Sequence, residues 1–390
     1  MNTGATLLRV RGAHDGDKVG MVELFFDLVF VFAVTQLSHT LLADLDVANA
    51  LRVALLLLAV WWVWIYTSWV TNWLDPERLP VRIALFVLML AGLLLSVSIP
   101  QAFGARGLEF AGAYAFMQVG RTLFFLWAIR GSERARVRNF QRILVWLLLS
   151  AVFWIDGGFA QGDARLAWWT TALLIEVVAA LAYFWVPGLG RSSTTDWDIS
   201  GAHLAERCAL FVIIALGESL LVTGATFAER AWDAATVTGF LSAVVGSILM
   251  WWIYFDTGAQ RAEHRITHSD DPGKHARRAY TYLHSLIVAG IIACAVADEL
   301  VLAHPHHGET AALVVILGGP ACYLAGTALF KWSTSERRGP PLSHLAGLLL
   351  LALLAWATFA LHLSPLAAGV AATAVLAVVA TWESLALRRA

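Results

Sequence analysis

The stretch Glu23–Ser38, ELFFDLVFVFAVTQLS, decides how this chain folds. Together with the apolar residues around it, the stretch is long enough to cross a bilayer core as a helix, which needs roughly 20 residues. It carries Glu23 and Asp27 early, it has no clear small-residue cleavage site, and further apolar runs follow it. We therefore expect a retained first membrane span and not a cleaved signal peptide.

The rest of the chain repeats this apolar pattern. Over 390 residues, 59% are hydrophobic and only 14% are charged, whereas soluble domains are nearer to half apolar and a quarter charged. The mean hydropathy is +0.69. The expected fold class is therefore all-α, a polytopic integral membrane protein of about 12 transmembrane helices. The predicted spans are 22–44, 50–72, 81–102, 107–130, 139–158, 166–187, 204–226, 236–257, 279–301, 309–331, 342–362 and 364–387.

The basic residues predict an orientation. When the loops are numbered alternately, 21 of the 27 lysines and arginines fall on one side or in the terminal segments on that side. Arg52, Arg106, Arg165 and Arg230 fall on the other side, and Arg121 and Arg207 lie inside spans. Because cytoplasmic loops carry the excess of basic residues, we expect a bacterial cytoplasmic (inner) membrane protein with both termini in the cytoplasm.

Short matches between the two halves predict an internal repeat. Trp64-Ile65-Tyr66 recurs as Trp252-Ile253-Tyr254, Ala91-Gly92 recurs as Ala289-Gly290, and Glu23–Ser38 resembles Glu206–Ser219. An even number of spans per half preserves orientation, so the repeat would be a parallel 6+6 duplication. The expected division is a cytoplasmic N-terminal segment (1–21), a first six-helix half (22–187), a cytoplasmic linker (188–203) and a second six-helix half (204–388).

Two motifs carry a resemblance to a known family. They are VELFFDLVFVFA at Val22–Ala33 and FVIIALGES at Phe211–Ser219, supported by Asn72–Asp75, by His203 with Glu206, and by Tyr282–His284. Over most of its length the chain resembles the bacterial low temperature requirement A (LtrA) family. The resemblance implies a multispanning membrane protein linked to growth at low temperature, and it implies no defined activity.

Charged and polar side chains inside the predicted spans are the candidate functional residues, because a buried charge costs at least about 2.5–3.5 kcal/mol at the centre of a span. The candidates for ion or proton binding are Asp27, Glu218, Glu23, Glu206, His284 and Asp256. The candidates for a gate or ion pair are Arg207, Arg121 and Glu176, with Arg207 and Glu206 as gate pairs, and Gln36, Ser38 and Ser219 extend a polar pathway. Acids outnumber arginines inside the spans, so some acids are expected to be protonated, to bind cations or to contact water.

Helical phase places these residues on stripes. Asp27 and Ser38 are eleven residues apart, as are Arg207 and Glu218, and eleven residues bring a helix back to nearly the same face. Each predicted half thus begins with a helix that carries polar groups at two depths. Such a stripe suits a proton or ion relay, and it places function in the first and seventh spans, with a substrate expected between the halves.

Structural roles remain open for several candidates. Glu23 and Glu206 can cap helix N-termini, Arg207 can extend to the membrane surface, and Glu176 can pack against Arg121 as a structural pair. His304, His306 and His307 are weak candidates for metal ligands, because their spacing lacks the helical i, i+4 pattern and a nearby thiolate, and we expect a solvated loop.

The sequence also argues against several function classes. A net charge of −1 gives no reason to expect nucleic acid, and no phosphate-binding glycine motif is present, so we expect neither a nucleotide nor a cofactor. The leading hypothesis is a secondary transporter or ion-conducting protein, with the bilayer and protons or inorganic cations as its partners. The alternatives are an intramembrane enzyme that acts on a lipid and a membrane sensor or scaffold.

Overall fold

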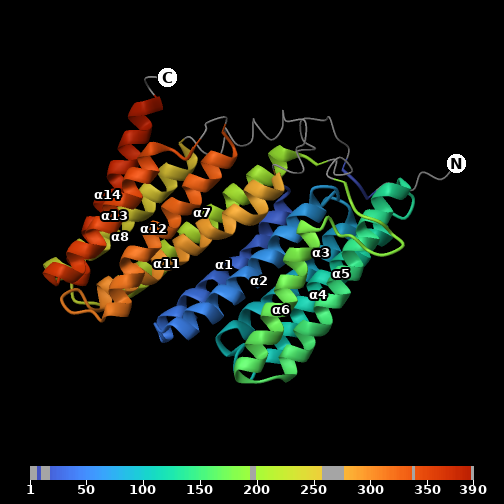
Figure 1. Cartoon of the computed structure of the whole chain (residues 1–390), viewed down its shortest axis with the longest axis horizontal. Coiled ribbons are helices and arrows are strands. Elements are labelled where there is room, and N and C mark those ends of the chain that lie inside the picture. Colours follow the sequence, from blue (N-terminus) through green and yellow to red (C-terminus); the bar gives the residue numbers. More distant parts are fainter. Residues whose placement is uncertain (1–6, 10–17, 194–198, 257–275, 336–338, 388–390) are drawn as a thin grey trace. The chain divides into compact units, whose positions relative to one another are not determined.

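The computed structural model describes residues 7–9, 18–193, 199–256, 276–335 and 339–387. Within these residues there are twelve long α-helices and no extended strand (Figure 1); two isolated β-bridges join Leu8 to Leu74 and Val186 to Gly190. The helices are α1 (Met21–Ala43), α2 (Val47–Thr71), α3 (Leu79–Ser98), α4 (Gly107–Ala128), α5 (Arg134–Phe159), α6 (Gly162–Leu181), α7 (Gly201–Ala228), α8 (Ala234–Phe255), α11 (His284–Ala303), α12 (Thr310–Ser333), α13 (Leu342–Leu361) and α14 (Pro365–Leu387). A 3₁₀ turn, η1 (Ile99–Gln101), follows α3, and a π-helical turn, η3 (Arg277–Leu283), precedes α11.

The described part of the chain is all-helical and contains twelve long helices, as the sequence predicts. Eleven helical segments in the described part of the chain are long and apolar enough to cross a membrane, and α4 is not among them. Helix α5 begins five residues before the predicted span, because its first turns are arginine-rich and extend beyond the apolar run. Helix α6 ends at Leu181, before residue 187, because Tyr183 and Phe184 adopt left-handed φ angles of 52° and 49° that stop the helix.

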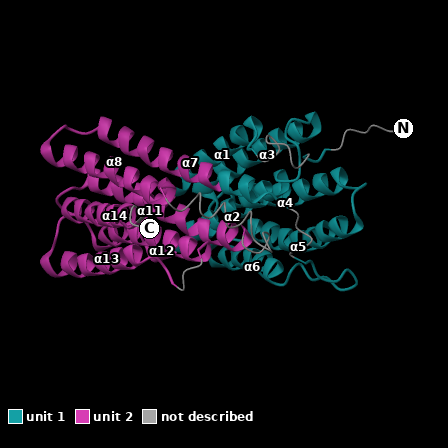
Figure 2. Cartoon of the chain, turned by 90° about the horizontal axis from the view of Figure 1, so that it is seen from above, with its two compact units in different colours: residues 1–37, 51–207, 271–274 teal, residues 38–50, 208–270, 275–390 magenta. Residues whose placement is uncertain are grey.

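The chain forms two compact units (Figure 2). The first unit contains the described residues up to Leu37 and Leu51–Arg207, and the second contains Ser38–Ala50 and the described residues from Cys208 onward. Aromatic side chains fill the core of the first unit, where Phe110, Tyr114, Trp154 and Trp169 are at most 1% exposed and contact one another. The predicted 6+6 repeat stays a prediction.

One buried arginine of the first unit donates hydrogen bonds to backbone carbonyls at two connections between helices. Arg165 in α6 is 4% exposed and donates hydrogen bonds to the carbonyls of Ala102, Gly104, Gly157, Gly158 and Ala160. A side chain at Gly107 would bring its Cβ within 2.3 Å of the Arg165 guanidinium carbon, so glycine makes room for this arginine. Arg165 therefore satisfies helix-end carbonyls, which gives one of the four arginines on the predicted outer side a structural role.

In the second unit, α11 and α12 pack backbone against backbone. A Cβ at Gly290 would lie 2.5 Å from the Tyr323 amide nitrogen, and Cβ atoms at Gly319 and Gly326 would meet the Cys294 and Ile287 amides at 2.9 Å. Small residues allow such close approach in membrane helix pairs. The glycines of both helices therefore set the distance between α11 and α12.

The start of α8 carries a pH-dependent cap outside the span. The Asp233 carboxylate accepts a hydrogen bond of 2.8 Å from the Thr236 amide, and this hydrogen bond lowers the pKa of the Asp233 carboxyl. A lowered pKa in the folded state adds stability above the unfolded-state pKa, and that stability is lost as the pH falls through the folded-state pKa. We expect Asp233→Ala to speed hydrogen exchange at the Thr236 amide at neutral pH and to have no effect in acid; equal exchange in both proteins at neutral pH would refute the cap.

Candidate functional site

Four ionisable side chains meet at the ends of α1 and α7 that lie in the first unit. Glu23 and Asp27 are four residues apart on α1, and His203 and Arg207 are four residues apart on α7. Residues at this spacing share one face of a helix, so each helix presents two of these side chains to the other. All four are buried, with exposures of 0–1%. We call these four residues the charged cluster.

Arg207 lies between the two carboxylates of the charged cluster. Its Nη2 donates a hydrogen bond of 2.7 Å to Asp27 Oδ1, and its Nη1 lies 3.3 Å from Glu23 Oε1. The indole of Trp64 on α2 also donates to Asp27 Oδ1, at 2.8 Å, and the guanidinium carbon lies 5.6 Å from the centre of that indole ring. Within the described residues, the buried Asp27 Oδ2 accepts no hydrogen bond.

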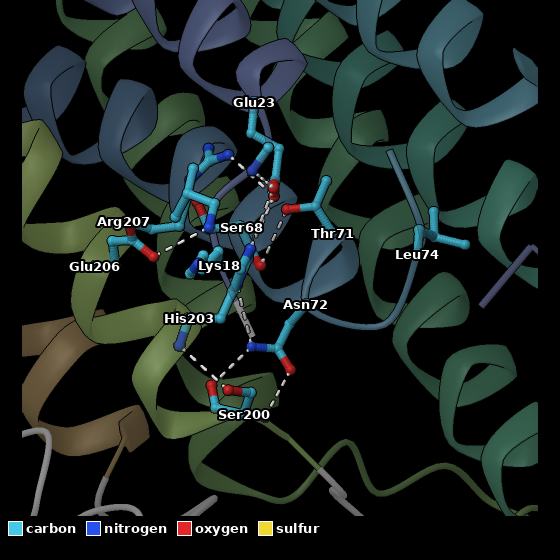
Figure 3. Close-up of polar contacts among 12 residues, drawn as sticks. Lys18, Glu23, Ser68, Thr71, Asn72, Leu74, Ser200, His203, Glu206 and Arg207 are labelled. Atoms are coloured by element: carbon cyan, nitrogen blue, oxygen red, sulfur yellow. Dashed lines mark hydrogen bonds and ion pairs between the residues drawn. The ribbon is translucent and has the colours of Figure 1, made fainter. Parts of the chain in front are cut away.

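The geometry around His203 fixes its neutral tautomer. The Asn72 amide is oriented by Ser200, whose carbonyl accepts from Asn72 Nδ2 at 2.8 Å and whose amide donates to Asn72 Oδ1 at 2.9 Å (Figure 3). Asn72 Nδ2 also lies 3.2 Å from His203 Nδ1, and because an amide nitrogen only donates, Nδ1 must accept. The ring proton of neutral His203 is therefore on Nε2, which lies 3.0 Å from Glu23 Oε1 and 3.2 Å from Arg9 Nη2.

A residue of the N-terminal segment completes the charge balance. The Arg9 amide donates to the Trp73 carbonyl at 2.8 Å, and the Arg9 side chain bonds to the Thr71, Leu74 and Lys18 carbonyls. Its Nη2 lies 2.6 Å from Glu23 Oε2. With His203 neutral, Arg9 and Arg207 balance the charges of Glu23 and Asp27, as a buried cluster requires.

The sequence predicted part of this cluster. Glu23, Asp27 and Arg207 were candidates, and the structure brings them together. The predicted gate pair of Arg207 and Glu206 is not what the structure shows: Glu206 is exposed and accepts from the Val19 amide at 3.0 Å. Adjacent residues of a helix point about 100° apart, so Glu206 faces away from Arg207.

A second buried carboxylate lies deeper in the first unit. Each oxygen of Glu176 accepts two hydrogen bonds, from Tyr114 and Gln118 on α4 and from Ser150 and Trp154 on α5, at 2.6–3.2 Å. Glu176 and Arg121, which the sequence predicted as a pair, are linked through Gln118. Arg121 donates to Gln118 Oε1 at 2.6 Å, and Gln118 Nε2 donates to Glu176. Gln118 therefore separates the two charges.

The second unit contains the remaining candidates. His284 follows the π-helical turn, and its Nδ1 lies 2.9 Å from the Ala279 carbonyl, which only accepts, so Nδ1 carries the proton. Nε2 then accepts from the Tyr254 hydroxyl at 2.8 Å. Asp256 is exposed and accepts from Ser384 at 3.0 Å. Glu218, Ser219 and Ser38 are buried, and Gln36, in the first unit, is half-buried.

No metal centre is formed by the residues that the structure describes. Among them, no three His, Cys, Asp or Glu side chains lie close enough together to hold an ion. His304, His306 and His307 belong to the residues searched, so the structure adds no support for metal binding at this loop.

The fold and the charged cluster define a class of protein, a polytopic α-helical membrane protein with compensated charges buried between its helices. The model of the family described as bacterial low temperature requirement A protein (LtrA) matches residues 18–381. The chain belongs to this family, which confirms the resemblance carried by its first and seventh spans. It is 42% identical over 379 residues to the uncharacterized protein RA0937 of Rhizobium meliloti (strain 1021), covering 96% of this chain and 91% of that protein. No solved structure matches it.

Proposed function

We propose that this protein moves protons across the bacterial cytoplasmic membrane, as a proton-coupled secondary transporter or a proton-conducting protein. The observation that carries the proposal is the position of Arg207 between Asp27 at 2.7 Å and Glu23 at 3.3 Å. Ionisable residues inside membrane spans usually serve ion or proton pathways. The loop charges support an orientation with both termini in the cytoplasm.

Arg207 has a carboxylate partner in either protonation state of Asp27. When Asp27 is ionised, Arg207 is bound to it and also neighbours Glu23. When Asp27 takes a proton, Arg207 keeps Glu23 as a counter-ion, and Glu23 then faces both Arg207 and Arg9, so the buried site gains one net positive charge. Asp27 Oδ2 is the atom that can receive the proton, since Oδ1 already accepts from Arg207 and Trp64. Asp27 is therefore the proposed proton carrier.

Glu23 and His203 extend this site toward the helix ends. His203 Nε2 faces Glu23 Oε1 at 3.0 Å, which is within the range for proton transfer between heavy atoms. Neutral His203 can pass its Nε2 proton to Glu23 only as a second proton reaches Nδ1, which requires the Asn72 amide to release Nδ1. Arg9 holds the other oxygen of Glu23 at 2.6 Å. In the proposal, these residues exchange protons with one side of the membrane.

Proton flux into liposomes tests this function. Purified protein is reconstituted with a pH-sensitive dye inside the vesicles, and a potassium gradient with valinomycin imposes the membrane potential. We expect wild-type protein to acidify the lumen faster than protein-free vesicles and Asp27→Asn to reduce the rate to the protein-free level. Glu77→Gln, which removes an exposed acid paired with Arg82, is the control and should keep the wild-type rate.

Two results would contradict the proposal. One is a wild-type rate no higher than that of empty vesicles. The other is an Asp27→Asn variant that is folded, as judged by gel filtration and thermal unfolding in detergent, and that retains the wild-type rate. Either result would favour a structural role for the charged cluster.

A further inference from the structure

The connection between α4 and α5 is the most basic stretch of the first unit. Residues 130–138, RGSERARVR, contain four arginines and one acid, Glu133. Arg130, Arg134 and Arg138 are exposed, and Arg136 is half-exposed. Arg134 and Arg138 are four residues apart in the first turns of α5, so they share one face of the helix. We call these four arginines the basic loop.

Three other arginines of the first unit bind acids or a backbone carbonyl of the chain, unlike the arginines of the basic loop. Arg78 pairs with Asp75 at 3.1 Å, and Arg82 pairs with Glu77 at 2.8 Å. Arg142 donates to the Leu189 carbonyl. In contrast, the four side chains of the basic loop form no ion pair with any acid in the described part of the chain. Their charge is therefore available to a partner outside the chain.

An exposed tryptophan beside the basic loop indicates its depth in the bilayer. Trp127 in the last turn of α4 is 46% exposed, and the Arg130 guanidinium lies 5.3 Å from the centre of its ring. Tryptophan is enriched at the membrane–water interface, at the level of the lipid headgroups. The basic loop thus lies where phosphate groups are concentrated.

We propose that the basic loop binds the headgroups of anionic phospholipids. The guanidinium group matches phosphate oxygens through paired N–H donors, and clusters of basic residues next to a span attract anionic lipids. An acidic peptide or a nucleic acid has the same charge, but neither accounts for the exposed Trp127 ring beneath Arg130. This inference stands apart from the proposed proton movement, because the basic loop shares no residue with the charged cluster.

Lipid binding can be measured directly on the full-length protein. Detergent-purified protein is titrated with phosphatidylglycerol or phosphatidylcholine and analysed by native mass spectrometry. We expect wild-type protein to retain phosphatidylglycerol over phosphatidylcholine. The variant with Arg130→Gln, Arg134→Gln, Arg136→Gln and Arg138→Gln should lose this preference, and replacing the same four residues with lysine should keep most of it.

The matched control is the double variant Arg78→Gln and Arg82→Gln, which removes half-exposed arginines that already have acidic partners. It should bind phosphatidylglycerol as the wild type does. The inference is overturned if the glutamine variant keeps the wild-type preference, if the control loses it equally, or if wild-type protein binds single-stranded RNA or an acidic peptide in place of the lipid.

Discussion

Replacing Arg207 with glutamine should lower the free energy of unfolding by about 3–5 kcal/mol, the typical cost of removing one partner from a buried ion pair. The reason is geometric: Asp27 and Glu23 are both fully buried, and Arg207 lies within 3.3 Å of each. Without it, Asp27 loses its arginine partner and only Glu23 keeps one, Arg9. Thermal unfolding or titration with sodium dodecyl sulfate in micelles measures the loss.

A charge-balanced variant separates this cause from lost packing. The double variant Asp27→Asn with Arg207→Gln removes one positive and one negative charge together. We expect it to recover most of the stability that Arg207→Gln loses, because the remaining Glu23 still has Arg9 at 2.6 Å. Arg82→Gln, which breaks an exposed pair, should cost no more than about 1 kcal/mol. The same loss in the single and double variants would show that charge compensation is not what Arg207 provides.

The second large effect is expected at Gly290, in the second unit. A valine there would bring its Cβ within 2.5 Å of the Tyr323 amide nitrogen, and a backbone atom cannot turn aside as a side chain can. The helices α11 and α12 must then separate, which also disturbs the hydrogen bond from the Tyr323 hydroxyl to the Met250 carbonyl. We expect Gly290→Val to destabilise the protein by about 3 kcal/mol, at the upper end of overpacking effects.

Gly318→Val is the matched control for Gly290→Val. Gly318 is also a helical glycine in this pair, but a Cβ there would meet no atom within 4 Å. We expect Gly318→Val to unfold within a few degrees of the wild type in detergent, while Gly290→Val unfolds well below it. If both variants unfold at the same temperature, close packing at Gly290 does not hold α11 and α12 together.

Much of the fold follows from local patterns in the sequence. Apolar runs of about 20 residues predicted all twelve helices, because in a bilayer each helix satisfies its own backbone hydrogen bonds. The errors occur at helix ends, where hydropathy says little. Arg134 begins α5 in polar sequence, and α6 stops where Tyr183 and Phe184 take left-handed φ angles.

The candidate site was harder to predict. Glu23, Asp27 and Arg207 were found because charges inside apolar runs are costly. Their pairing was missed, because helical periodicity describes the faces of one helix and not which helices meet. Arg9 was missed for a different reason: it lies outside the spans, and its contacts with residues 71–74, with the adjacent bridge of Leu8 to Leu74, bring it to Glu23.

The structure also changes how the buried acids are understood. The excess of acids over arginines within the spans suggested several uncompensated carboxylates. In the first unit, however, Asp27 and Glu23 have arginine partners, and Glu176 accepts four hydrogen bonds from neutral side chains. In our proposal, Asp27 can therefore take up a proton because Arg207 still has a second carboxylate, Glu23, beside it. The proposal does not need an isolated acid.

Infrared difference spectroscopy tests this central claim most directly. Wild-type protein in liposomes is cycled between neutral and acidic buffer, and the carbonyl stretch of protonated carboxyl groups is recorded. The account predicts a band that appears on acidification, disappears in Asp27→Asn and persists in Glu176→Gln. An unchanged band in a folded Asp27→Asn variant would contradict it, because Asp27 would then not be the group that takes the proton.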